Sequence, residues 1–176
     1  MKTLNIKKMI AAALLIALSF IGANLKIMGT IAFDSMPGFL GALLLGPVWG
    51  ALIGAAGHFL TALFAGFVLT LPVHLEIMGI MAGATAAFGA IYRRLAGKRK
   101  GLSGGAALTA AFAAVLINGP AGIAVLSVQL LPVLGKAGLL TLTGVLSAAA
   151  ALNIAAALLL YHLLLGKLDI AGIDHE

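Results

Sequence analysis

The chain has 176 residues, of which 62% are hydrophobic and only 9% are charged, and its formal net charge is +6. Its mean hydropathy is +1.18. Apolar runs of about 20 residues recur along the whole length, which is typical of membrane-spanning helices and leaves no room for a separate soluble domain. The composition therefore predicts an all-α integral membrane protein that forms a single domain over residues 1–176.

The charge and the motifs exclude several classes of function. The basic residues are confined to short tails and one loop, so they indicate membrane topology and not nucleic-acid binding. The chain has no cysteine, which excludes disulfides and thiolate metal sites. It also lacks a phosphate-binding loop, a nucleophile elbow and paired catalytic acids. We therefore predict no enzyme, no cofactor and no metal, and any uphill transport would need a partner or an ion gradient.

The first apolar segment has two interpretations. Lys2, Lys7 and Lys8 precede residues 10–21, and Ile21-Gly22-Ala23 resembles a signal-peptide cleavage site. A first membrane helix with cytoplasmic lysines produces the same pattern. Because the rest of the chain is a multispan protein, we favour the membrane helix, over residues 6–23.

A polar loop with Lys26 and Asp34 follows, and then the apolar block 37–67, which is interrupted at Gly46-Pro47. This block could be one helix kinked at the proline, or two helices with a glycine ending the first and a proline starting the second. The basic cluster at 93–100 decides between them, because only two helices place it on the same side as the N-terminal lysines.

Six helices with both termini in the cytoplasm result from this choice. We expect them at residues 6–23, 37–46, 47–66, 73–92, 103–131 and 136–165. The second is about 15 Å long at 1.5 Å per residue, whereas the hydrocarbon core is roughly 30 Å thick. The loop before it must therefore be re-entrant and line a cavity. The outer connections 24–36, 67–72 and 131–135 should surround one mouth.

Ionisable side chains inside a membrane protein usually mark a functional site. Asp34 could bind a ligand, or it could cap the next helix or form an Asx turn; Lys26 could pair with it or extend to the outer interface. His74 and Glu76 open the fourth helix, where the helix dipole would also favour an acid. This pair could face a ligand as well, and it is the best polar pair for one; we expect His58 to be a buried histidine bonded to a neighbouring helix.

Other polar and aromatic residues carry weaker signals. Asn118 precedes Gly119-Pro120 and could repair the hydrogen bonds that the proline breaks or could face the cavity. Gln129 and Asn153 could join helices. The four phenylalanines near the outer side could pack against lipid or form a wall for a flat ring; these are Phe33, Phe39, Phe64 and Phe67.

The chain resembles the substrate-binding subunit, or S component, of energy-coupling factor (ECF) vitamin transporters. The resemblance is carried by the small size, the six spans, the Ala13-xxx-Ala17 pair of the first helix, and the segment IAFDSMPGFLGALLLGP leading into VWGALIGAAGHFLTALFAGF. It covers essentially the whole chain. Together with LTLPVHLEIMGI, these segments look most like the α-ribazole transporters of Gram-positive bacteria.

The resemblance implies a role in the bacterial cell membrane. An S component captures its vitamin from outside, then associates with a transmembrane coupling subunit and two cytoplasmic ATPases and topples to release the substrate inside. Ala13 and Ala17 would belong to the surface that meets the coupling subunit.

α-Ribazole is a dimethylbenzimidazole joined to ribose, so it would suit stacking on Phe33. Its hydroxyl groups would suit five polar residues, namely Asp34, His74, Glu76, Asn118 and Gln129. Two alternatives remain open: an S component for another vitamin or nucleoside-like precursor, and a stand-alone secondary transporter that uses His58 or Glu76 as a proton relay.

Overall fold

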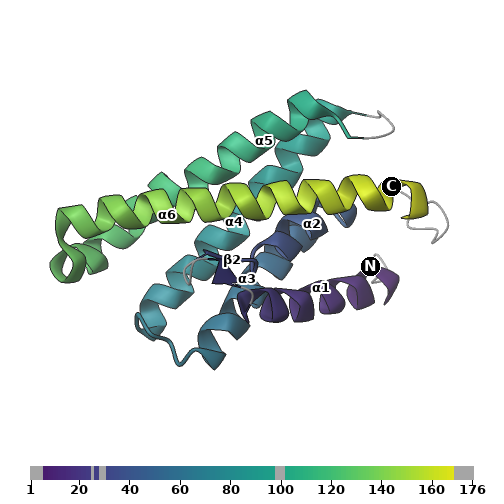
Figure 1. The fold of residues 1–176 in the computed structure, drawn as a ribbon. Helices are drawn as coiled ribbons and strands as arrows, with labels where there is room; N and C mark the ends of the chain where they lie inside the picture. The colour runs from purple at the N-terminus through teal and green to yellow at the C-terminus, as the bar shows by residue number, and fades with distance from the viewer. Residues whose placement is uncertain (1–5, 25, 28–30, 98–101, 169–176) are drawn as a thin grey trace.

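A computed structural model describes residues 6–24, 26–27, 31–97 and 102–168, with side chains at 6–24, 32–97 and 102–165. Figure 1 shows an elongated helical bundle in which both ends of the described chain lie at the same end of the molecule. The expected all-helical architecture is confirmed, apart from one very short pair of strands.

The helices follow the predicted order with shifted boundaries. They are α1 (Ile6–Asn24), α2 (Met36–Leu44), α3 (Pro47–Phe64), α4 (Leu71–Ala96), α5 (Gly104–Leu116) and α6 (Gly122–Leu168), with a π-helical turn η1 (Ile117–Ala121) between the last two. Within the described residues, four apolar helical segments are long enough to cross a membrane: Ile6–Asn24, Pro47–Phe64, Leu71–Ala96 and Gly104–Leu165.

The last of these segments folds back on itself. Gly135 has non-helical angles of φ 65° and ψ 176°, and Figure 1 shows the chain reversing direction at the left end of α6. The sequence predicts a connection over residues 131–135. In the structure the helix continues to residue 134, and Gly135 alone has non-helical angles. The two arms make close contact further down, where a Cβ at Gly119 would lie 2.1 Å from Ser147 Oγ.

The Gly46-Pro47 break separates two helices, as predicted. Gly46 has a φ of 114°, which residues with a side chain rarely adopt, and Pro47 opens α3. The short helix α2 lies in the middle of the bundle. Its core residues Phe39, Ala42 and Leu43 are almost completely buried, and α3, α4, α6 and α1 all pack around it.

The segment before α2 is more regular than the predicted loop. Two-residue strands β1 (Lys26–Ile27) and β2 (Ile31–Ala32) pair antiparallel, with Lys26 opposite Ala32. The side chain of Lys26 lies outside the described residues, so its expected pairing with Asp34 stays a prediction. Figure 1 places β2 beside the end of α1 and in front of α3.

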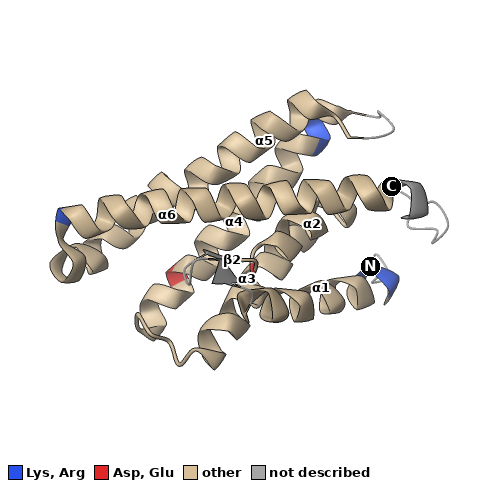
Figure 2. Ribbon diagram, in the orientation of Figure 1, with Lys and Arg blue, Asp and Glu red and all other residues tan. Residues whose placement is uncertain are grey.

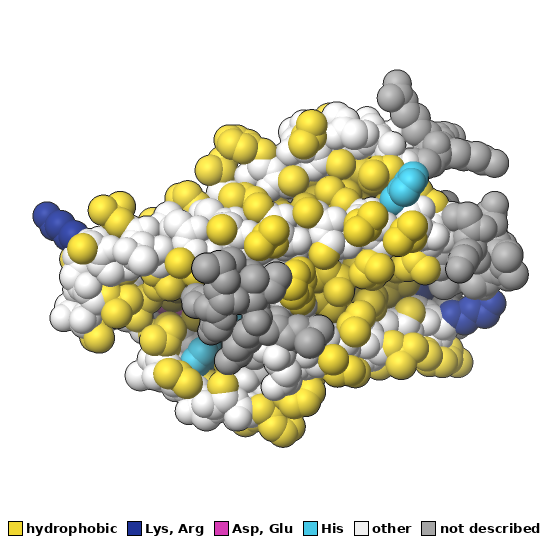
Figure 3. All heavy atoms as spheres, viewed as in Figure 1, with side chains coloured by type: hydrophobic (Ala, Val, Ile, Leu, Met, Phe, Trp, Pro, Cys, Tyr) yellow, Lys and Arg dark blue, Asp and Glu magenta, His cyan; other side chains and the backbone are white. Residues whose placement is uncertain are grey.

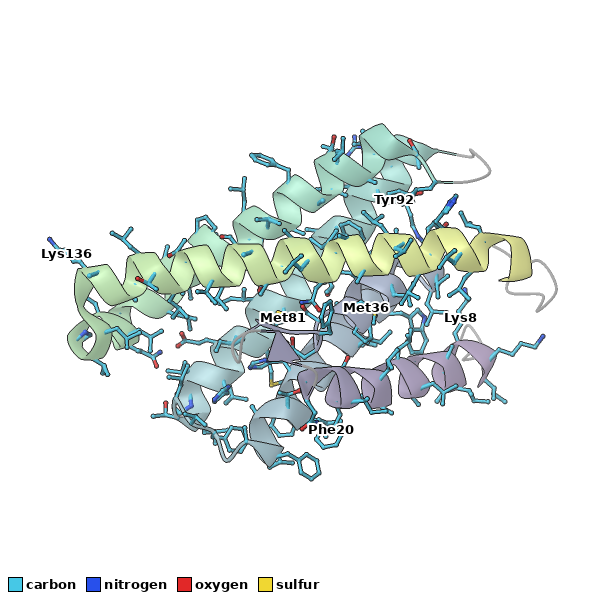
Figure 4. All side chains as sticks on the ribbon, viewed as in Figure 1. Lys8, Phe20, Met36, Met81, Tyr92 and Lys136 are labelled. Atoms are coloured by element: carbon cyan, nitrogen blue, oxygen red, sulfur yellow. The ribbon has the colours of Figure 1, made fainter. Side chains whose placement is uncertain are left out.

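The basic residues of the described chain lie at the two ends of the bundle, and the acidic segments lie between these ends (Figure 2). Figure 4 shows Lys8 and Tyr92 at the end that holds both termini, and Lys136 at the other tip. In Figure 2 the basic segments lie at the first end and at that tip, whereas the two acidic segments lie away from the termini. Figure 3 shows that apolar side chains dominate the visible face between these ends, as a lipid-facing surface requires.

Candidate functional site

The segment Ala32–Met36 crosses the bundle between α1 and α6. The backbone N–H of Phe33 donates to Gly22 O on α1 at 3.0 Å. This contact needs a glycine, because a Cβ at Gly22 would lie 2.3 Å from Phe33 O. The backbone of Phe33 and Asp34 is therefore held beside the C-terminal end of α1.

Asp34 is half-buried, and its backbone lies against α3, where Asp34 O is 3.9 Å from a Cβ built on Gly57. Burial raises the pKa of the Asp34 carboxyl, while hydrogen bonds from the backbone N–H groups of Asp34 and Ser35 oppose that rise. The helix-capping position belongs to Ser35, which makes no side-chain cap bond. The carboxyl thus forms a local turn contact, as one of the two interpretations of Asp34 allows.

Asn153 on α6 holds the other side of this segment. Its Oδ1 accepts a hydrogen bond from Met36 N at 2.7 Å, and its Nδ2 donates to Ala32 O at 2.8 Å and to Ala149 O at 2.9 Å. The side chain is 1% exposed. The prediction that Asn153 joins elements is confirmed, although it joins a helix to the loop segment as well as to the start of α2.

Two histidines lie together on α3 and α4. His58 Nε2 is 3.2 Å from His74 Nδ1, and Leu69 N donates to His74 Nε2 at 3.5 Å. The expected bond from His58 to a neighbouring helix is confirmed. Because a backbone N–H can only donate, a neutral His74 carries its proton on Nδ1 and donates it to His58 Nε2. His58 then presents an N–H at Nδ1, whereas both nitrogens of His74 are already engaged.

Glu76 contacts Gln129 across the bundle, with Gln129 Nε2 donating to Glu76 Oε1. Both residues are half-buried. The prediction that Glu76 sits in the first helical turn is wrong, because α4 begins at Leu71 with Pro72 near its start and has no acid in its first turn. The helix dipole therefore gives Glu76 little support, since its effect fades within one turn.

Asn118 lies in the π-helical turn η1, together with Pro120. Its side chain is half-buried and forms no hydrogen bond within the part of the chain that the structure describes. Of the two interpretations of Asn118, the repair of bonds broken by the proline is therefore not supported for its side chain. The extra residue of the π turn accommodates the proline instead.

The four phenylalanines do not form one wall. Phe39 is fully buried and packs edge-on against Phe88 in the core, at a ring distance of 5.3 Å. Phe64 is exposed and contacts Phe20. Phe67 instead joins the histidines, with its ring 5.7 Å from that of His74.

The structure thus places the backbone of Asp34 against α3 at Gly57, and it pairs His58 with His74 and Glu76 with Gln129. Among the residues that it describes, it shows no group of three or more metal-ligating side chains. The sequence predicts structural roles for His58 and Asn153. In the structure His58 contacts His74, and Asn153 bonds the backbone of Ala32 and Met36. A signal for both was present, because each is a lone polar residue in an apolar helix.

Ala13 and Ala17 are both exposed on α1, so they are free of the bundle interior. The Gly50 and Gly54 pair of α3 differs, because a Cβ at Gly50 would lie 2.5 Å from Ala42 and one at Gly54 2.9 Å from Thr85. Gly50 and Gly54 therefore serve internal packing, whereas Ala13 and Ala17 lie on the outer surface of α1.

A family model described as "ECF transporter, substrate-specific component" matches residues 7–166, which is nearly the whole chain. The curated proteins and the solved structures contain no match.

Proposed function

Since the chain belongs to the family of ECF transporter substrate-specific components, we propose that it captures α-ribazole at the polar end of the bundle. The family places it in a membrane, as a multi-pass transporter subunit that works with a transmembrane coupling subunit, ATPase subunits and a small-molecule substrate. The choice of α-ribazole and of a bacterial cell membrane is our proposal.

One observation carries the location of the site. Polar side chains of an otherwise apolar chain lie on separate elements and form two pairs between helices, His58 with His74 and Glu76 with Gln129, while Asp34 precedes α2. Burying such groups without function is costly in a membrane protein. These contacts between elements support a ligand site between the segment 32–36, α4 and α6.

The chemistry of these groups fits a neutral ligand with hydroxyl groups. Carboxylates accept hydrogen bonds from hydroxyls, and the amide of Gln129 can both donate and accept. Among the described side chains, neither Asp34 nor Glu76 has a Lys or Arg ion-pair partner. A phosphate or carboxylate on the ligand would therefore face two acids that no described cation compensates, which disfavours anionic substrates.

Phe33 and His58 complete the proposed contacts. A flat benzimidazole could stack on Phe33, whose backbone is fixed by Gly22. We assign His58 Nδ1–H as a donor toward the ligand, because His74 uses both of its ring nitrogens within the protein. His74 then orients His58, and Asn118 supplies a further amide with no partner in the described chain.

We also propose six spans with both termini in the cytoplasm. Support comes from the basic residues near the termini, namely Lys7, Lys8, Arg93 and Arg94, and from Lys8 and Tyr92 lying at that end in Figure 4. In a cell, a cysteine replacing Lys136 should react with an impermeant maleimide from outside. A cysteine replacing Lys8 should react only after permeabilisation, and the reverse pattern would invert the topology.

Transport of α-ribazole tests the function. The protein is reconstituted in proteoliposomes alone, and together with the coupling subunit and two ATPases. We expect accumulation only in the complete complex with ATP. Uphill accumulation by the protein alone would support a proton-coupled secondary transporter and contradict the proposal. Accumulation of a different vitamin by the complete complex, with none of α-ribazole, would refute the substrate while keeping the family role.

A further inference from the structure

We propose that Asn153 is a positioning residue, which sets the place of the segment 32–36 and thereby of Phe33 and Asp34. The amide of Asn153 grips this segment at both of its ends. It accepts from Met36 N at 2.7 Å and donates to Ala32 O at 2.8 Å. One side chain on α6 thus fixes two backbone groups that are four residues apart.

The bond to Met36 replaces a missing helix cap. Met36 is the first residue of α2, so its N–H has no partner inside the helix. Ser35 stands at the capping position but forms no side-chain cap bond. Asn153 therefore caps α2 from a helix 117 positions further along the chain.

The amide of Asn153 is nearly saturated. Its two N–H groups bond Ala32 O and Ala149 O, and its oxygen accepts from Met36. The Asn153 residue is 1% exposed, and its bonds to Met36 and Ala32 are partly buried. Loss of the amide would remove these partners from the N–H of Met36 and the carbonyl of Ala32, so the segment would move toward water to replace them.

Two anchors hold this segment between separate helices. On the α1 side, Phe33 N donates to Gly22 O at 3.0 Å, and on the α6 side Asn153 bonds Ala32 and Met36. α1 packs mainly against α2 and α3. The segment therefore links α1 to α6 across α2, and Asn153 is the side chain that closes this link.

A cysteine reporter tests the idea directly, because the natural chain contains no cysteine. Ser35 is 5% exposed and makes no cap bond, so Ser35→Cys changes little and its thiol should react slowly with a water-soluble maleimide. In the Asn153→Leu background we expect the reaction to speed up by roughly tenfold or more, since the hydrogen bonds to Met36 and Ala32 are lost.

Asn24→Leu is the matched control. Asn24 is exposed and bonds Phe20 O in its own helix at 2.9 Å, so its loss should leave the reactivity of the introduced thiol unchanged. Equal reactivity in the Asn153→Leu and parent backgrounds would overturn the proposal. An increase of similar size with Asn24→Leu would overturn it as well, because the effect would then not be specific to Asn153.

Amide hydrogen exchange in the unmodified protein decides the matter if Asn153→Leu fails to fold. We expect slow exchange at Met36, comparable with Gly38 and Phe39, whose N–H groups bond Ser35 O. Fast exchange at Met36 beside slow exchange at Phe39 would overturn the proposal, because the cap bond would then be absent.

The consequence for substrate rests on the proposed function. If Phe33 and Asp34 contact α-ribazole, Asn153→Leu should raise its dissociation rate by roughly tenfold. A parent protein that does not bind α-ribazole would refute the proposed substrate, while the reactivity of the Ser35→Cys thiol would still test Asn153. An unchanged dissociation rate together with faster labelling would overturn the link to the ligand.

Discussion

The two ends of the short helix α2 are held by opposite chemistry. At its C-terminal end, Arg93 Nη2 donates to Leu43 O at 3.4 Å, and its guanidinium lies 3.1 Å from the position of a Cβ on Gly46. At its N-terminal end, the neutral amide of Asn153 accepts from Met36 N. A cation suits a helix C-terminus, where it also satisfies the last carbonyls.

The comparison explains how a nine-residue helix can sit inside a membrane protein. Helix ends carry unpaired backbone groups, and lipid cannot satisfy them. Longer helices supply the missing partners, so α2 never faces lipid with open ends. At the C-terminal end of α2, the guanidinium of Arg93 has this structural role. Among the described side chains, no Lys or Arg pairs with Asp34 near the N-terminal end, and we propose that this acid contacts the ligand.

The largest effect should come from the exposed alanines of α1, Ala13 and Ala17. Ala17→Leu adds bulk to the surface proposed to meet the coupling subunit. We expect recovery of that subunit in co-purification to fall by up to roughly 100-fold, with α-ribazole binding unchanged. Ala155→Leu, also an exposed alanine but on α6, is the control. Equal losses in both variants would remove Ala17 from the interface.

The preference of the protein for a neutral ligand over a charged one tests the role of Asp34 and Glu76. The parent should bind α-ribazole more tightly than its 5′-phosphate by roughly 10- to 100-fold, because the phosphate would approach Asp34 and Glu76. In the double variant Asp34→Asn, Glu76→Gln the preference should shrink. Titration calorimetry measures both ligands. Thr141→Val, which alters an exposed hydroxyl bonded to its own helix, should keep the parent's preference. A preference that survives neutralisation would show that the acids do not set it.

A matched pair of glycines tests the contact between the two arms around Gly135. Gly119→Ala would place a Cβ 2.1 Å from Ser147 Oγ, whereas Gly144 has open space around it. We expect Gly119→Ala to lower the free energy of unfolding by about 1–3 kcal/mol. Gly144→Ala should be neutral or stabilising by up to about 1 kcal/mol, through helix propensity. Chemical denaturation in detergent measures both, and similar values would contradict the close contact.

The smallest effect concerns the pH dependence of stability. Burial raises the pKa of Asp34 above its ordinary 3.8, so the folded state binds more protons than the unfolded state over that interval. Stability should therefore fall as pH rises from 3.8 through the raised pKa. Asp34→Asn removes this cost and should melt at a higher temperature than the parent at about pH 7. The difference should shrink as the pH approaches 3.8. An Asn variant that is less stable than the parent at neutral pH would refute the argument.

Much of the fold could be predicted from the sequence, because apolar runs and the Gly46-Pro47 pair are local signals. The exact ends of the helices could not be predicted. Pro72 marks the start of the fourth helix only approximately, so the sequence places Glu76 in a first turn, whereas α4 in fact begins at Leu71. The π turn at Asn118 was also missed, since a proline in a helix can be accommodated by a kink or by an extra residue.

The partners of the polar residues were beyond sequence reasoning. Nothing in the spacing of Asn153 and Met36 indicates that one caps the other across 117 positions. The pairing of His58 with His74 depends in the same way on how α3 packs against α4. Composition identified these residues as unusual in a membrane helix, and only the packing showed which ones meet.

Equilibrium binding of labelled α-ribazole to the purified protein tests the central claim most directly. The parent and Thr141→Val should bind one ligand per chain. Asp34→Ala and Glu76→Ala should each bind roughly 10- to 100-fold more weakly, as expected for the loss of hydrogen bonds to a charged group. A parent that does not bind, or acid variants that bind as tightly as the parent, would contradict a site at this end of the bundle.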